Sequence, residues 1–241
     1  MTVPPADLEC PDPDGCPVAA SLPQLRSTIL RAGSALSRVD DATWGYDVHN
    51  PGYGDARFSP IDDPTTANRL PSMYIASTPA AALLETVFHD VHHVSDRYIY
   101  ERDLRGKLLA RLRLPAAATL GDLRDPELDR LGLARTQVAS SPAEHYPCTR
   151  RLAGAALSQS RRGRALVGLI WHSRQAELAD TNPVEVIVLF GAPRYPLGRG
   201  SWPLFGSGAS SLYDGPGRLL VDEIAESLSA VIELDDAGPA K

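Results

Sequence analysis

The stretch MYIASTPAAALLETVFHD, residues 73–90, decides the fold because it joins a short strand directly to a helix. Residues 73–77 have the composition of a strand, and Thr78 is a typical helix N-cap. Pro79 then takes the first helical position, where its missing N–H leaves no hydrogen bond unmade. The sequence predicts a helix from here to about Val94, with an apolar stripe formed by Ala81, Leu84, Val87, Phe88 and Val91.

Glu85 stands out on this predicted helix because it is a lone carboxylate at the edge of the apolar stripe. A charged residue in such a place is commonly a solvated boundary residue. The helix follows a strand directly, however, and Glu85 lies within about two turns of the helix start. A site built at the strand–helix junction would direct the carboxylate inward, so the residues alone leave both interpretations open.

The remaining segments mix helices and strands without a strict βαβ rhythm, which favours an α+β fold with one mixed central β-sheet and flanking helices. No G-x-G-x-x-G follows a predicted strand and no Walker P-loop occurs. We expect strands at 97–104, 107–115, 165–173 and 184–190, helices at 120–135 and 149–160, and a helix followed by a strand over 217–234.

The 241 residues, 43% of them hydrophobic, are enough to bury a core. We expect one domain over 23–234, preceded by a disordered or loosely packed arm at 1–22 and followed by a flexible tail at 235–241. The net charge of -6 argues against a protein that wraps nucleic acid. Because no signal peptide and no apolar run of about 20 residues is present, we expect a cytoplasmic protein that does not bind membranes.

Two groups of residues suggest metal sites, and for both a simpler interpretation is preferred. Cys10 and Cys16 are too widely spaced for a C-x2-C knuckle, so these two are expected to be free thiols, and with Cys148 they form no regular disulfide framework. Glu85, His89 and His92 would share one face of the predicted helix and could form a metal-dependent hydrolase site. A solvated, histidine-rich helix end is the alternative, and we assign no metal site.

Four further polar residues are candidates for a binding site. Ser173 ends the predicted strand 165–173, where a hydroxyl would touch a ligand or simply end the strand. No G-x-S-x-G surrounds it, which argues against a serine hydrolase. Arg31 and Arg57 would form a diphosphate clamp beside a cleft, and would otherwise be surface residues. Tyr74 alternates away from its two apolar neighbours and would face the same cleft.

Four stretches together resemble the RES-domain family, the toxins of bacterial toxin–antitoxin pairs. They are LRAGS (residues 30–34), ARFSP (56–60), YIASTPAAALLETVFHDV (74–91) and GLIWHSR (168–174), and the resemblance covers roughly residues 25–195. The family takes its name from an arginine, a glutamate and a serine. The matching positions in this chain are Arg31, Glu85 and Ser173.

The resemblance implies a fold similar to ADP-ribosyltransferases and an enzyme that degrades NAD+ by hydrolysis or phosphorolysis of the nicotinamide–ribose bond. It implies Arg31, Glu85 and Ser173 as catalytic residues, with Arg57 and Tyr74 binding the substrate. NAD+ would be consumed, so no resident cofactor is needed. Transfer of ADP-ribose to a protein target is the alternative activity of the same cleft.

The resemblance also implies a partner, an antitoxin with an Xre-like helix-turn-helix that blocks the active site. The chain itself is not expected to bind nucleic acid. Its oligomeric state stays open, a homo-oligomer included.

Overall fold

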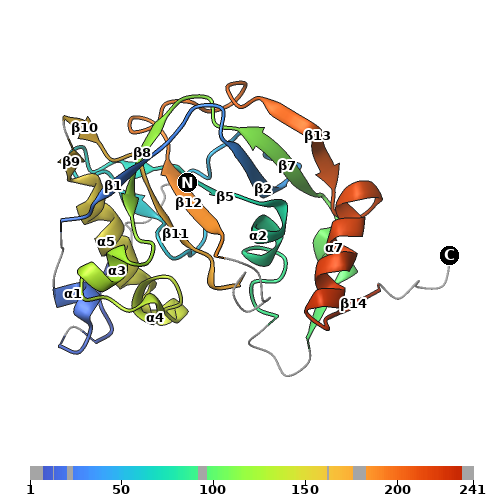
Figure 1. Ribbon diagram of the computed structural model, residues 1–241, viewed down its shortest axis with the longest axis horizontal. Helices are drawn as coiled ribbons and strands as arrows, with labels where there is room; N and C mark the ends of the chain where they lie inside the picture. The colour runs from blue at the N-terminus through green and yellow to red at the C-terminus, as the bar shows by residue number, and fades with distance from the viewer. Residues whose placement is uncertain are drawn as a thin grey trace.

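The computed structural model describes residues 8–12, 14–20, 24–91, 97–161, 163–175 and 183–234. The predicted tail at 235–241 lies outside these residues. Figure 1 shows a twisted sheet with α1, α3, α4 and α5 grouped at one side and α7 at the other.

The centre of the molecule is an eight-stranded mixed sheet, which confirms the predicted α+β class. Strands β8 and β11 run parallel, and the other neighbouring strands of this sheet are antiparallel. In spatial order the strands are β1 (Ser27–Leu30), β8 (Ala118–Asp122), β11 (Gly168–His172), β12 (Glu185–Phe190), β5 (Ser72–Ala76), β2 (Ala35–Asp41), β7 (Lys107–Arg113) and β13 (Leu204–Ser211).

Short strand pairs and helices surround this sheet. The pairs are β3 (Ile61–Asp62) with β4 (Arg69–Leu70), β6 (Tyr98–Tyr100) with β14 (Val231–Glu233), and β9 (Ser160–Arg161) with β10 (Arg164–Ala165). The helices are α1 (Pro17–Ala20), α2 (Pro79–Leu84), α3 (Glu127–Arg130), α4 (Arg135–Val138), α5 (Tyr146–Leu157) and α7 (Gly215–Ser227), with 3-10 turns η1 (Glu101–Leu104) and η2 (Ala143–His145).

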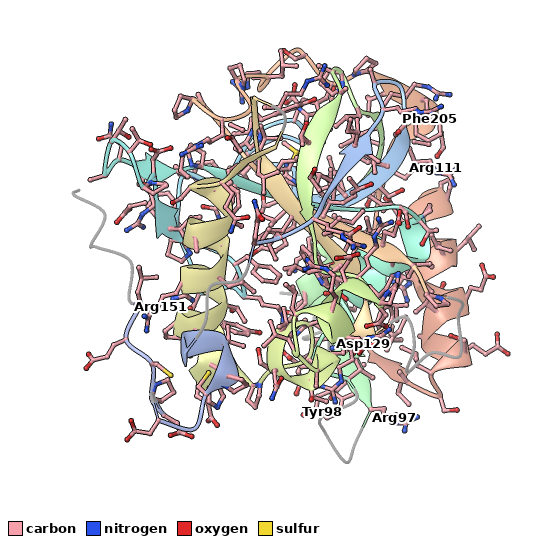
Figure 2. All side chains as sticks on the ribbon, turned by 60° about the vertical axis from the view of Figure 1, so that its left-hand side comes forward. Arg97, Tyr98, Arg111, Asp129, Arg151 and Phe205 are labelled. Atoms are coloured by element: carbon pink, nitrogen blue, oxygen red, sulfur yellow. The ribbon has the colours of Figure 1, made fainter. Side chains whose placement is uncertain are left out.

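The central strands are buried on both faces, as their continuous apolar sequences predict. On β12, Val186 and Val188 pack into one core cluster, while Ile187 and Leu189 pack into a second cluster across the sheet. The sheet edge is more open: at β13, Phe205 lies over β7, with its ring centroid 6.0 Å from the Arg111 guanidinium carbon (Figure 2).

Two element predictions are wrong. The polar helix expected over 120–135 is instead the end of β8 followed by α3 and α4, because Leu120 is buried in the sheet and Gly132 takes a positive φ of 69° that ends the first helix. The strand expected over 97–104 stops at Tyr100, where η1 begins.

Three side chains of the N-terminal arm reach the core, although most of its other described residues are exposed. Cys10 and Cys16 are each 8% exposed, Val18 is 1% exposed, and all three belong to the main core cluster. These three side chains attach the arm to the domain. The boundary between arm and domain stays a prediction.

Candidate functional site

Helix α2 is short, and its two ends explain where Glu85 lies. The Thr78 hydroxyl oxygen accepts a hydrogen bond from the Ala81 amide at 3.1 Å, as expected of an N-cap. The helix ends at Leu84 and not near Val94, because the Thr86 hydroxyl donates to the Ala82 carbonyl at 2.6 Å and competes with the helical pattern. Glu85 is consequently the C-cap residue, at the turn where the chain leaves the helix.

The carboxylate of Glu85 is held by Ser173. The Ser173 hydroxyl donates to Oε1 of Glu85 at 2.5 Å, although the two residues are far apart in the sequence. Ser173 directly follows β11, its amide donates to the Val184 carbonyl at 2.9 Å, and its side chain is fully buried. Because the Ser173 hydroxyl is fixed in place, its charge-assisted hydrogen bond orients the Glu85 carboxylate. The predicted pairing of these two residues in one site is thus present in the structure.

Glu85 faces a cleft that opens where the central sheet divides. Strands β2 and β5 pair only at Ser37 and Ala76, after which β2 continues along β7 and β5 continues along β12. The resulting hollow has a volume of about 370 Å³ and is lined by both strands, by Glu85 and by the loop that carries Arg57. In Figure 1, α2 lies below this part of the sheet. The geometry suits a small organic ligand.

Arg57 contributes the cation of the cleft. Its Nη1 donates to the carbonyls of Val138 and Ser141, each at 3.0 Å, and to the Ser141 hydroxyl at 2.7 Å. The guanidinium also lies 5.1 Å from the centroid of the Tyr146 ring. Burial lowers the pKa of Arg57, and the nearby Tyr146 and Glu85 act in the opposite direction. The side chain is therefore held rigidly in the wall beside the carboxylate.

Tyr74 forms the floor of the cleft, as its alternation on the strand predicts. Its hydroxyl accepts a hydrogen bond from the Phe58 amide at 3.1 Å and lies 3.2 Å from the Ser59 hydroxyl. Its ring meets the ring of Trp171 edge-on at 6.1 Å. Burial raises the pKa of Tyr74 to about 12, so the phenol stays neutral at physiological pH.

A second hollow adjoins the first. It has a volume of about 530 Å³ and shares Arg57, Glu85, His89 and Tyr146 with the cleft, while its outer wall comes from residues 139–143. Glu85 and Arg57 therefore line both hollows, and a ligand that extended from one hollow into the other would contact both residues.

Comparison with known proteins identifies the family of this chain and a solved structure with a similar fold. The profile of the RES domain matches residues 28–198. The chain belongs to the RES-domain family. Its fold is similar to one chain of the crystal structure of the M. tuberculosis MbcT–MbcA toxin–antitoxin complex, with a TM-score of 0.53 and 15% identity over 87% of this chain and 95% of that chain. A search of curated proteins found no significant match.

Within this RES domain, Arg31, which was predicted to belong to the site, lies away from the cleft. Arg31 is exposed, in the turn between β1 and β2, and does not line the cleft. A second arginine beside Arg57 lines the cleft: Arg38 on β2 is 8% exposed and donates from Nη1 to the carbonyls of Tyr46 and Val48, both at 2.8 Å. The placement expected for Arg31 is therefore wrong, because β1 pairs with β8 at the far edge of the sheet.

Sequence reasoning missed Arg38 and Tyr146. A signal for Arg38 does exist, since a lone arginine inside the alternating stretch ALSRVDD must be either exposed at an edge or buried with partners. Tyr146 offers no such signal, because it reaches Arg57 from the start of α5 through tertiary packing.

The metal site considered on the predicted helix is not formed by the described residues. With α2 ending at Leu84, Glu85 and His89 no longer share a helix face, and His92 lies outside the described part of the chain. His89 Nδ1 instead lies 2.7 Å from the Asp90 carboxylate. No helix in the described ranges is long and apolar enough to cross a membrane.

Proposed function

We propose that this RES-domain protein is the toxin of a toxin–antitoxin pair and that it degrades NAD+ by cleaving the nicotinamide–ribose bond. The observation that carries the proposal is the Glu85 carboxylate, exposed to the cleft on one side and fixed by the buried Ser173 hydroxyl on the other. Family membership supports the substrate, and the similarity to a chain of a toxin–antitoxin complex supports the biological role.

The two adjoining hollows share Arg57 and Glu85, and the proposal places a dinucleotide across both. We assign one end of NAD+ to each hollow and the diphosphate to the junction beside Arg57. The hydrogen bonds of Arg57 to other described residues all use Nη1, so the remaining N–H groups of the guanidinium fork are assigned to phosphate oxygens. The neutral ring of Tyr74 provides a flat surface for a base or the nicotinamide.

The bond that breaks joins the nicotinamide nitrogen to the ribose. Its electron pair leaves with nicotinamide, and positive charge develops on the ribose carbon and ring oxygen. Glu85 would stabilise this charge at close range in a partly desolvated site. An oxygen of water or phosphate then forms the new bond to the ribose carbon, and a proton passes to solvent when water attacks. Ser173 acts as a positioning residue, because its buried hydroxyl reaches the substrate only through Glu85.

The proposal includes a partner that controls the site. A toxin that consumes NAD+ must be held inactive in its own host, and we expect an antitoxin with an Xre-like helix-turn-helix to cover the cleft. Purified complex should then turn over NAD+ far more slowly than the free chain. A complex in which NAD+ still reached Glu85 at the full rate would contradict this part of the proposal.

The first test is NAD+ turnover by the purified chain, with and without inorganic phosphate. Glu85→Gln should lower kcat on the order of 10²-fold or more, because the charge that stabilises the transition state is lost. Ser173→Ala should reduce kcat roughly 10-fold with little change in KM, because one hydrogen bond to a charged group is removed. Dependence on phosphate would identify the acceptor.

The matched control is Glu223→Gln, which removes the same charge from an exposed position on α7 and should leave turnover unchanged. Circular dichroism should show that each variant is folded. Intact NAD+ after prolonged incubation with folded, partner-free protein would refute the proposal. A mass increase of a protein target by ADP-ribose would redirect it to transferase activity.

A further inference from the structure

The three cysteines of the chain lie close together in the fold, although Cys148 is far from Cys10 and Cys16 in the sequence. Their Sγ atoms all lie within 4.8 Å of one another, and those of Cys10 and Cys148 are 3.1 Å apart. Cys10 and Cys16 come from the N-terminal segment, and Cys148 comes from the first turn of α5. Figure 2 brings this side of the molecule forward and shows α1 lying against α5.

A turn that begins at Asp12 brings Cys16 back toward Cys10. The Cys16 amide donates to the Asp12 carbonyl at 3.0 Å, and the Gly15 amide donates to the Asp12 carboxylate at 3.1 Å. A Cβ at position 15 would lie 2.4 Å from Oδ2 of Asp12, so a larger residue there would displace the Asp12 carboxylate from its hydrogen bond. Five residues separate Cys10 from Cys16, more than in a C-x2-C knuckle, but this turn still brings the two thiols close together.

We propose that Cys10, Cys16 and Cys148 bind a thiophilic divalent cation, Zn²⁺ in the first instance, which fastens the N-terminal segment to α5. A tetrahedral zinc with bonds of about 2.3 Å separates its sulfur ligands by about 3.8 Å. The observed sulfur separations need only small side-chain adjustments to reach that value. Three protein ligands leave the fourth position to a water molecule or another donor.

The chemistry of the pocket agrees with a cation. Burial, reinforced by the neighbouring Cys10 and Cys16 thiols, raises the pKa of Cys148 well above its ordinary value. Cysteine binds metal as the thiolate, so a cation at this point would compensate the charge of its sulfur ligands. Binding should release protons, and affinity should rise with pH.

The site also touches the loop that shapes the cleft. The residue after Cys148 is Thr149, whose hydroxyl donates to the Arg57 carbonyl, and Arg150 Nε donates to the carbonyls of Ala56 and Ser59 at 3.1 and 3.2 Å. A cation at the cysteines would thus fix the start of α5, and through it the backbone on either side of Arg57.

The test is metal content and thiol state of the full-length chain. We expect about one zinc per chain by elemental analysis, and replacement with Co²⁺ should give the thiolate-to-cobalt charge-transfer absorption of a tetrahedral site. Cys148→Ser and Cys16→Ser should each lose the bound metal and that absorption. Removal of zinc from the wild-type chain should lower its thermal midpoint, and added zinc should restore it.

The control is Ala153→Gly, which disturbs the packing of α5 but keeps all three thiols, and it should retain the metal. If Cys148→Ser does not fold, the cobalt spectrum of the wild-type chain and of Cys16→Ser still decides the question. Three free thiols that take up neither Zn²⁺ nor Co²⁺ would overturn the proposal. A disulfide seen as a mass loss of two hydrogens, or metal retained by both serine variants, would overturn it as well.

Discussion

The central residue of the site is Glu85, and its properties come from its surroundings. On the sequence it is a carboxylate at the edge of an apolar stripe. In the fold it caps α2, accepts a hydrogen bond from Ser173 and shares two hollows with Arg57. A carboxylate that is fixed by a buried donor yet open to a cleft is suited to stabilising positive charge on a bound sugar.

A prediction at the same scale separates the two candidate arginines. Arg38→Lys should lower both NAD+ turnover and the free energy of unfolding, the latter by about 2 kcal/mol. Lysine has one nitrogen and cannot reproduce a guanidinium that donates to two carbonyls from Nη1 and to Asp40 from Nη2. Arg31→Lys should change stability by less than about 0.5 kcal/mol and leave turnover unaltered, because Arg31 is exposed outside the cleft. Kinetics and thermal unfolding of both variants test this, and the reverse result would restore Arg31 to the site.

At the scale of elements, α2 matters because it is short. Its six residues include four buried ones, Ala81, Ala82, Leu83 and Leu84, so packing against β2 and β7 holds a helix that would not persist alone. The cap at Thr78 fixes where the helix begins, and the helix length then fixes where Glu85 leaves it.

Removing that cap should therefore affect both stability and function. Thr78→Ala is expected to lower the free energy of unfolding by about 1 kcal/mol, because the Ala81 amide loses its acceptor. Thr78→Ser keeps the oxygen and should stay close to the wild type. Chemical denaturation measures the difference, and equal stability of the two variants would show that the cap does not hold α2.

At the scale of the whole molecule, acid stability should depend on His49. Burial, together with the charge of Arg38, lowers the pKa of His49 from 6.5 to about 4. Its Nε2 is buried without a hydrogen-bond partner among the described residues. Between these two pH values the unfolded chain binds a proton that the folded chain does not, so stability falls as the pH is lowered through this window.

The variant His49→Gln should isolate this contribution. The wild-type free energy of unfolding should decrease by up to about 1.4 kcal/mol more per pH unit than that of the variant below pH 6.5. Above that pH the two curves should run parallel, because His49 is then neutral in both states. Urea titrations across the range measure this, and identical slopes would show that His49 titrates normally.

The sequence by itself determined the α+β class, the central strands and the strand–helix junction, and the family resemblance assigned Glu85 and Ser173 to one site. Each of these depends on local signals: apolar runs, an N-cap, and a family resemblance carried by contiguous stretches. Tertiary structure decided what depends on distant segments. It ended α2 at Leu84, placed Arg38 and not Arg31 at the divided sheet, and brought Cys148 to the N-terminal cysteines. Strand order and helix packing are set by contacts between remote residues, which no local pattern records.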